Sequence, residues 1–244
     1  MVRTPGDDGS TDPTDQEAAL SRRLVLLLCV PLAIAALVVG GAWVYANVVE
    51  GDPAAELTLS DTTGAPAPSA TAAGPGDWTV TGESQVGYRV DEVLFGQNVT
   101  AVGRTNEVTG GITLDDATVT KAAFTVDMAS VTSDRDRRDG QYRSRIMAVS
   151  EFPTSEFALT EPIELGSLPA DGATVTAKAT GDLTLRGVTK PVTFDVKARR
   201  SGARMEVNGS IPLTFADWGI PSPSFGPAEV EDTGALEFLL VLAP

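Results

Sequence analysis

The stretch "GDLTLRGVTKPVTFDVKA", Gly181 to Ala198, decides the fold class. Apolar and polar residues alternate before the turn at Arg186–Gly187, and the alternation resumes after Pro191. A period of two residues is typical of a β-strand with one apolar and one wet face. A short turn containing glycine joins two such strands into a hairpin. We therefore expect a strand up to the turn and a new strand beginning beyond Pro191.

The same alternation recurs in "ATVTKAAFTVDM", "TVTAKATGDLTL" and "RMEVNGSIPLTF", and short links such as "LDDA" and "RRSGA" separate the strands. Strands with one wet face and short connections predict an antiparallel sheet. About eight of them, from residue 77 to residue 244, would close into a barrel, which removes exposed edges. A two-sheet sandwich is the alternative.

One segment, "SVTSDRDRRDGQYRSRIM", breaks the alternation. Ser133 can cap a helix with Asp136 three residues on, and Tyr142 and Ile146 share a helical face. We expect a short helical excursion between strands.

The N-terminal third differs in composition. Residues 1–23 are polar and acidic, as in a disordered tail. Residues 24–46 contain no charge and could cross a hydrocarbon core of about 30 Å as one transmembrane helix. Residues 47–76 are rich in Ala, Pro, Gly, Ser and Thr, which predicts a linker.

Arg22 and Arg23 directly precede the apolar run, and Glu50 and Asp52 follow it. The positive-inside rule then predicts a single-pass membrane protein with a cytoplasmic N-terminus and an extracytoplasmic domain. A cleaved signal peptide is the competing interpretation, although the run is long for one. Cys29 lies inside the run after Leu28 rather than after a small residue, which argues against a lipidated cysteine.

The amino-acid composition restricts the classes of function that this chain can have. A net charge of −15 disfavours nucleic acid as a partner. The absence of histidine excludes Ser-His and Cys-His nucleophile pairs and histidine-ligated metals. The carboxylates at Asp115–Asp116, and at Glu229, Glu231 and Asp232, fall in expected turns and loops rather than across a cleft. We therefore predict no enzyme, no metal and no cofactor.

The order of motifs resembles the YceI-like, polyisoprenoid-binding family. The resemblance rests on "VTGGITLDDATVTKAAFTVDMASVTSD", "RDGQYRSRIMAVSEFPTSEFAL" and "GDLTLRGVTKPVTFDVKA" and covers residues 78 to 243. It implies a lipocalin-like antiparallel barrel that holds an isoprenoid or similar long apolar lipid, without catalysis. Two departures distinguish this chain from the family pattern: family members often carry a histidine in an early strand, and "FADWGI" stands where Arg-Asp-Phe-Gly is common.

The large apolar residues of the domain are ordinary core candidates, and the resemblance makes them candidates for lining a lipid cavity. These are Tyr88, Phe95, Phe124, Val126, Phe152, Phe157, Phe194, Phe215 and Trp218.

Basic residues supply candidate contacts to a lipid headgroup, since guanidinium groups suit phosphate oxygens. They are Arg137, Arg138, Arg143, Arg186 and Lys190. Solvated or ion-paired surface positions are the plainer interpretation. The alternative function is a cell-envelope interaction module with a solid-packed barrel and no lipid.

Overall fold

The computed structural model describes residues 39–41, 53–60, 74–94, 96–168, 170–224 and 228–244. The chain divides into two compact units, Met1–Gly51 and Asp52–Pro244. Of the predicted transmembrane span, only Val39–Gly41 is described, as helix; the rest of the span and the tail at 1–23 lie outside the described residues. In the part of the chain that the structure describes, no helix combines the length and apolarity needed to cross a bilayer.

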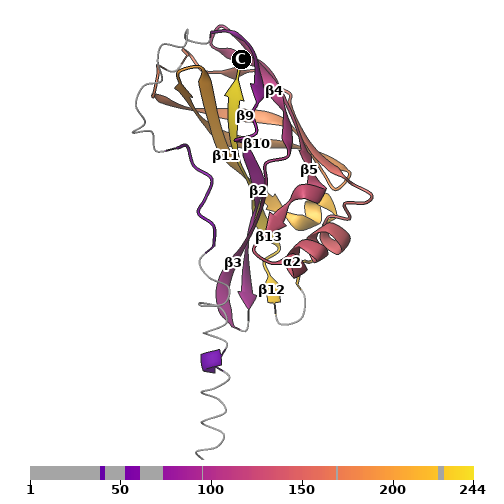
Figure 1. Ribbon diagram of the computed structural model, residues 1–244. Helices are drawn as coiled ribbons and strands as arrows, with labels where there is room; N and C mark the ends of the chain where they lie inside the picture. Colours follow the sequence, from indigo (N-terminus) through magenta and orange to yellow (C-terminus); the bar gives the residue numbers. More distant parts are fainter. Residues whose placement is uncertain (1–38, 42–52, 61–73, 95, 169, 225–227) are drawn as a thin grey trace, which may run out of the picture. The chain divides into compact units, whose positions relative to one another are not determined.

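The second unit is mainly β (Figure 1). Its strands are β1 (Gly76–Val80), β2 (Gln85–Leu94), β3 (Gln97–Thr105), β4 (Val108–Asp115), β5 (Thr118–Asp127), β6 (Thr132–Ser133), β7 (Thr154–Leu159), β8 (Ile163–Glu164), β9 (Thr174–Leu185), β10 (Val188–Ser201), β11 (Arg204–Thr214), β12 (Ala228–Val230) and β13 (Thr233–Ala243). The helical elements are η2 (Met128–Ser130), α2 (Asp136–Gln141), η3 (Tyr142–Ile146) and η4 (Phe215–Trp218).

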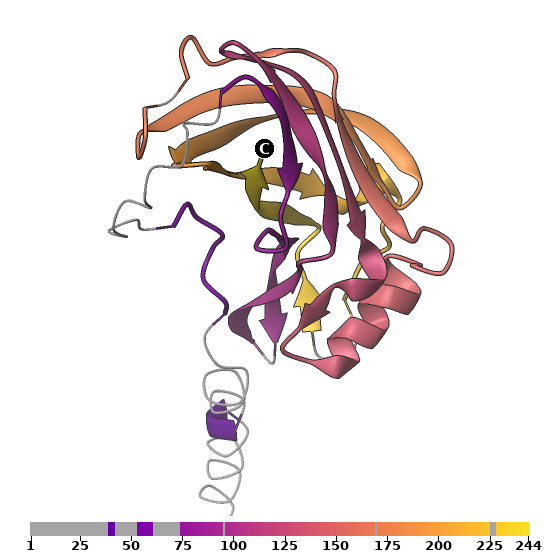
Figure 2. The same ribbon diagram turned by 45° about the horizontal axis from the view of Figure 1, so that its top comes forward.

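The sheet closes on itself, which confirms the barrel over the sandwich. Around the ring the order is β1, β4, β5, β7, β9, β10, β11 and β13, and β13 pairs back with β1 through Thr79–Ala243 and Val80–Leu242. All these pairings are antiparallel. β13 also pairs with β2, which with β3 extends the wall towards α2. Figure 2 shows the strands curving around a common interior.

The hairpin at Arg186–Gly187 has the predicted turn. Both residues have positive φ, 51° and 73°, as a two-residue type I′ turn requires. The second strand differs from the prediction, because β10 begins at Val188 and includes Pro191. Proline is tolerated there because the pairing with β11 covers Val196–Ser201, so Pro191 lies in a half of β10 with β9 as its paired neighbour.

The predicted alternation defines the inside of the barrel. Phe194, Val196 and Ala198 on β10 are buried, whereas Asp195 and Lys197 between them are exposed. β13 departs from the rule, because Glu237 and Val241 on its outer face are also buried. Other residues of the protein therefore cover the outer face of β13.

The predicted helical excursion is confirmed as α2 followed by the π-helical turn η3. The predicted cap is wrong: Arg135, not Ser133, occupies the N-cap position of α2, and no side chain caps the helix there. Ser133 bonds Asp139 instead. The Asp139 Oδ1 atom accepts hydrogen bonds from the Ser133 amide at 2.8 Å and hydroxyl at 2.6 Å. Tyr142 and Met147 from this excursion join the hydrophobic core, so it covers one end of the barrel.

Candidate ligand site: the barrel interior

The barrel interior contains a partly open cavity of about 120 Å³. Its lining comes from every strand of the ring except β1 and is apolar apart from Ser155 and Glu156. The Ser155 hydroxyl donates to the Thr184 carbonyl oxygen at 2.9 Å, and the Glu156 side chain belongs to an exposed residue. Water needs polar partners to occupy such a space, so an apolar molecule is the favoured occupant.

Aromatic rings form a connected group at the cavity wall. Phe157 and Phe194 meet edge to face with centroids 5.5 Å apart, and Phe194 meets Phe238 in the same way at 5.9 Å. Edge-to-face packing is the favoured geometry for such rings. Phe238 was not among the predicted lining residues, and β13 shows no clear alternation there, because Leu239 and Val241 between Phe238 and Leu242 are also apolar.

Two glycines on the inner wall leave room for these rings. A Cβ atom at Gly181 would lie 2.5 Å from Phe157 Cζ, and one at Gly209 would lie 2.6 Å from Phe238 Cζ. Side chains larger than hydrogen would therefore push the rings towards the cavity.

The structure divides the predicted lining residues into two groups. Phe124, Val126, Phe157 and Phe194 line the cavity. Four of the others do not line it. Phe215 and Trp218 are part of the core and Tyr88 packs against it, while Phe152 lies next to Gly187. Phe95 is outside the described residues.

Tyr88 and Tyr142 stack where the excursion meets the barrel wall, with ring centroids 5.3 Å apart. Burial raises the pKa of Tyr88 to about 12, and burial followed by the neighbouring Tyr88 raises that of Tyr142 further. Both phenols are therefore neutral at physiological pH, so the stack adds no charge to this part of the barrel.

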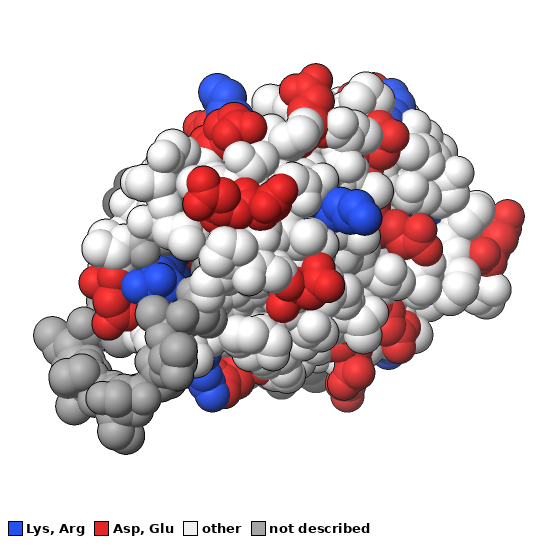
Figure 3. All heavy atoms as spheres, turned by 90° about the horizontal axis from the view of Figure 1, so that it is seen from above, with Lys and Arg blue, Asp and Glu red and all other residues white. Residues whose placement is uncertain are grey.

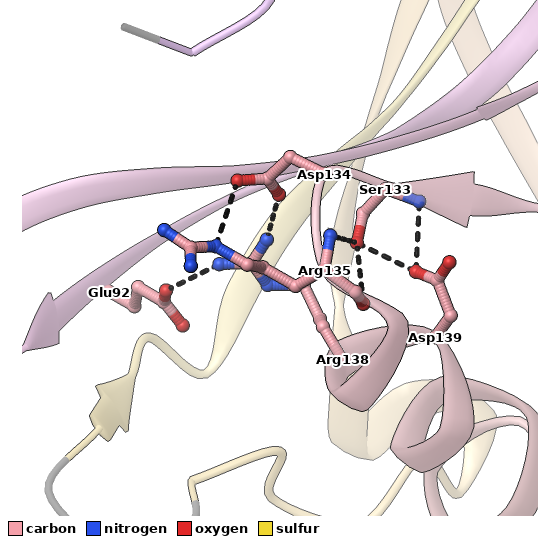
Figure 4. A network of polar contacts seen from close by, with 6 residues as sticks. All are labelled: Glu92, Ser133, Asp134, Arg135, Arg138 and Asp139. Atoms are coloured by element: carbon pink, nitrogen blue, oxygen red, sulfur yellow. Dashed lines mark hydrogen bonds and ion pairs between the residues drawn. The ribbon is translucent and has the colours of Figure 1, made fainter. Parts of the chain in front are cut away.

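None of the five basic candidates lines the cavity, and Arg138, Arg186 and Lys190 bond other residues of the protein. Arg138 contacts Asp134 and lies 3.2 Å from Glu92 Oε1, within the polar network of Figure 4. Arg186 donates to the Gly219 carbonyl oxygen, and its guanidinium lies 5.8 Å from the Phe152 ring centroid.

Lys190 bonds Asp217 Oδ1 at 3.2 Å and lies 5.8 Å from the Trp218 ring centroid. Arg137 is exposed on α2, and Arg143 is half-buried on η3. These five residues belong to the hairpin and excursion at the helix-covered end of the barrel.

The opposite end of the barrel is acidic. Its turns carry Asp115, Asp116, Glu164 and Asp171, all exposed, and Figure 3 shows acidic side chains spread over this face. The cavity extends towards this end, because Val119 is among its lining residues. Val119 lies close to the β4–β5 turn and pairs with Ile163 of β8. Among the described residues no group of acidic, cysteine or histidine side chains is arranged to hold a metal ion.

The family model for the YceI-like domain matches residues 78–242, nearly the whole barrel. This chain belongs to the YceI-like domain family. A UPF0312 protein of Pseudomonas aeruginosa (strain LESB58) is 36% identical over 138 residues, covering 53% of this chain and 68% of the relative. A UPF0312 protein of Pseudomonas putida (strain W619) is 33% identical over 130 residues, covering 50% of this chain and 64% of the relative.

Solved structures share the fold of this YceI-like domain. A polyisoprenoid binding domain from Saccharophagus degradans superposes with a TM-score of 0.57 at 18% identity, covering 70% of this chain and 99% of that one. BcnA of Burkholderia cenocepacia gives 0.51 at 21% identity, covering 66% and 98%. At these identities the likeness concerns the fold alone.

Proposed function

We propose that this YceI-like domain binds a long apolar lipid of the isoprenoid class inside its barrel. The observation that carries the proposal is the apolar cavity inside the barrel, because a cavity without polar partners favours hydrocarbon over water. The Saccharophagus degradans domain with the same fold is described as binding polyisoprenoid, which supports the same ligand class. The cavity also favours binding over the alternative of an interaction module with a solid barrel.

The size of the cavity sets a condition on binding. About 120 Å³ is close to the roughly 150 Å³ of an engineered cavity that accepts one benzene ring. A long chain therefore needs inner side chains to change rotamer as it enters. Phe124 and Phe157 line the cavity and are only half-buried, so their rings have space to move.

Affinity would come mainly from hydrocarbon removed from water, at about 25 cal/mol per Å². The acidic turns disfavour an anionic headgroup at that end of the barrel. The predicted headgroup contacts therefore require the headgroup to lie at the helix-covered end, where the basic candidates are found. These are Arg137, Arg138, Arg143, Arg186 and Lys190.

We further propose that residues 24–46 anchor the chain in a membrane, with residues 1–23 cytoplasmic and the barrel extracytoplasmic. The uncharged run and the preceding Arg22–Arg23 support this arrangement. A membrane anchor would raise the effective concentration of the barrel near its lipid. Protease digestion of intact cells tests it: the barrel should be cleaved, whereas protection of the barrel until lysis would contradict the orientation.

Two variants on opposite faces of β5 test the ligand site. Ala122 lines the cavity, whereas the next residue, Ala123, is exposed outside. The full chain is purified from bacterial membranes, and bound lipid is extracted and quantified by mass spectrometry. We expect prenyl lipid with the native chain and with Ala123→Phe, and its loss with Ala122→Phe. Equal lipid in both variants, or none in the native chain, would contradict binding inside the barrel.

A further inference from the structure

Residues Pro53–Ser60, inside the predicted linker, lie extended along the outer wall of the barrel (Figures 1 and 2). They belong to the same compact unit as the barrel. Leu57 and Leu59 are half-buried there, and the other six residues of the segment are exposed. The segment thus presents alternate side chains to the wall, as a bound extended peptide does.

The wall recognises the main chain of this segment. Arg89 Nη2 donates to the Ala54 carbonyl oxygen at 2.7 Å, and Asn208 Nδ2 donates to that of Leu57 at 2.9 Å. Arg104 and Arg199 donate in the same way to the carbonyl oxygens of Ala55 and Ser60. Since carbonyl oxygens are common to all residues, these contacts select an extended backbone.

One buried carboxylate, that of Glu237, holds two of these donors in place. Glu237 is 6% exposed and bonds Arg89 Nε at 2.5 Å and Arg104 Nη2 at 3.2 Å. Arg89 uses Nε for Glu237 and Nη2 for the segment, whereas Arg104 uses Nη2 for both, so Glu237 fixes each guanidinium beside the segment. Such preorganisation lowers the entropic cost of binding.

A second carboxylate clamps the end of the segment. Glu206 accepts from the Ser60 amide at 3.0 Å and hydroxyl at 2.7 Å, and lies 3.0 Å from Arg199 Nη2. Burial acts to raise the pKa of Glu206, but the hydrogen bonds from Ser60 and Arg199 outweigh burial and lower it. Glu206 therefore binds Ser60 as an ionised carboxylate at neutral pH.

The same wall retains unused hydrogen-bonding capacity. Arg104 Nε, Arg199 Nε and Asn208 Oδ1 are buried and have no hydrogen-bond partner among the described residues. Buried polar atoms are normally satisfied, so each exception requires an explanation. The resident segment thus leaves part of the wall's bonding potential open.

We propose that this wall, formed by Arg89, Arg104, Arg199, Glu206 and Asn208, is a docking site for an extended peptide, occupied in cis by the chain's own Pro53–Ser60. It is separate from the cavity and independent of lipid binding. Short flexible connections give effective concentrations on the order of 1 mM. If the segment is to stay docked within its own chain, the same sequence as a separate peptide must therefore bind an empty wall with a Kd below about 1 mM.

A full chain with residues 53–60 replaced by Gly and Ser in alternation provides an empty site. The probe is a fluorescein-labelled peptide "PAAELTLS", followed by anisotropy in detergent, with circular dichroism confirming the β fold. We expect saturable binding to the replaced chain, and binding at least about tenfold weaker to the native chain, whose site is occupied.

Further variants of the replaced chain identify the surface. Arg199→Ala and, separately, Asn208→Ala should each weaken peptide binding several-fold. Lys178→Ala, which removes an exposed ion pair with Asp195, should leave it unchanged. No saturable binding to the folded replaced chain, equal binding to the native chain, or binding insensitive to both wall variants would overturn the proposal.

Discussion

The Arg186 guanidinium donates a hydrogen bond to the carbonyl oxygen of Gly219, which joins the β9–β10 turn to the residue that ends η4. Four residues further along β10, Lys190 pairs with Asp217 in η4. Arg186 in the turn and Lys190 beyond it thus attach "LRGVTKP" to "FADWG". This gives both residues a structural role, whether or not they also meet a headgroup.

Replacing Arg186 with Ala should lower the free energy of unfolding by about 1 kcal/mol, because the Gly219 carbonyl loses a charged donor. Lys190→Ala should cost less, since its ion pair is exposed. Chemical denaturation measures both, and lipid extraction is done in parallel. Unchanged stability with loss of bound lipid would instead assign Arg186 to the headgroup.

The alternation of side chains predicted an antiparallel sheet and much of its inner face, but it left the choice between barrel and sandwich open. The inward positions of β9, β10 and β11 follow directly from it, and Phe124, Val126, Phe157 and Phe194 do line the cavity. The helical excursion was marked by its break in that pattern.

Other features depend on contacts that local patterns do not encode. Pro53–Ser60 has the composition of a linker, and its attachment depends on arginines and a glutamate far away in the sequence. The engagement of Arg186 and Lys190 with η4 likewise depends on how the ring of strands brings the two turns together.

Removing the buried carboxylate of Glu237 should be strongly destabilising. Glu237→Gln leaves the guanidinium groups of Arg89 and Arg104 mostly buried without a countercharge, at a cost of about 3 kcal/mol. Chemical denaturation measures this cost. The matched control is Asp195→Asn, whose ion pair with Lys178 is exposed and should contribute less than about 1 kcal/mol. Similar effects of the two substitutions would contradict the structural role of Glu237.

Gly209→Ala should lower stability by about 1–3 kcal/mol and reduce lipid capacity, because the new methyl group meets the Phe238 ring at 2.6 Å. Gly140→Ala is the control, since a Cβ atom there meets nothing within 4 Å on α2. Removing a helical glycine should raise stability by about 0.5–1 kcal/mol. Thermal unfolding should therefore shift in opposite directions for the two variants.

Alkaline pH should destabilise the folded chain through the tyrosine stack. The folded-state pKa of Tyr88 is about 12 against an ordinary value of 10.0. A raised pKa contributes stability that is complete below pH 10 and is lost as pH rises towards 12. Denaturant midpoints measured across this range should fall, and Tyr88→Phe should flatten the dependence. An unchanged slope in Tyr88→Phe would show that this phenol does not carry the effect.

The most direct test of lipid binding inside the barrel is photo-crosslinking of the full chain with an uncharged prenyl chain that carries a diazirine near its end. Cross-linked peptides are then identified by mass spectrometry. Binding inside the barrel predicts labels on cavity-lining residues such as Phe124, Phe157 and Phe238, which excess unlabelled prenyl lipid removes. Labels confined to outward-facing residues such as Ala123 and Lys197 would contradict it.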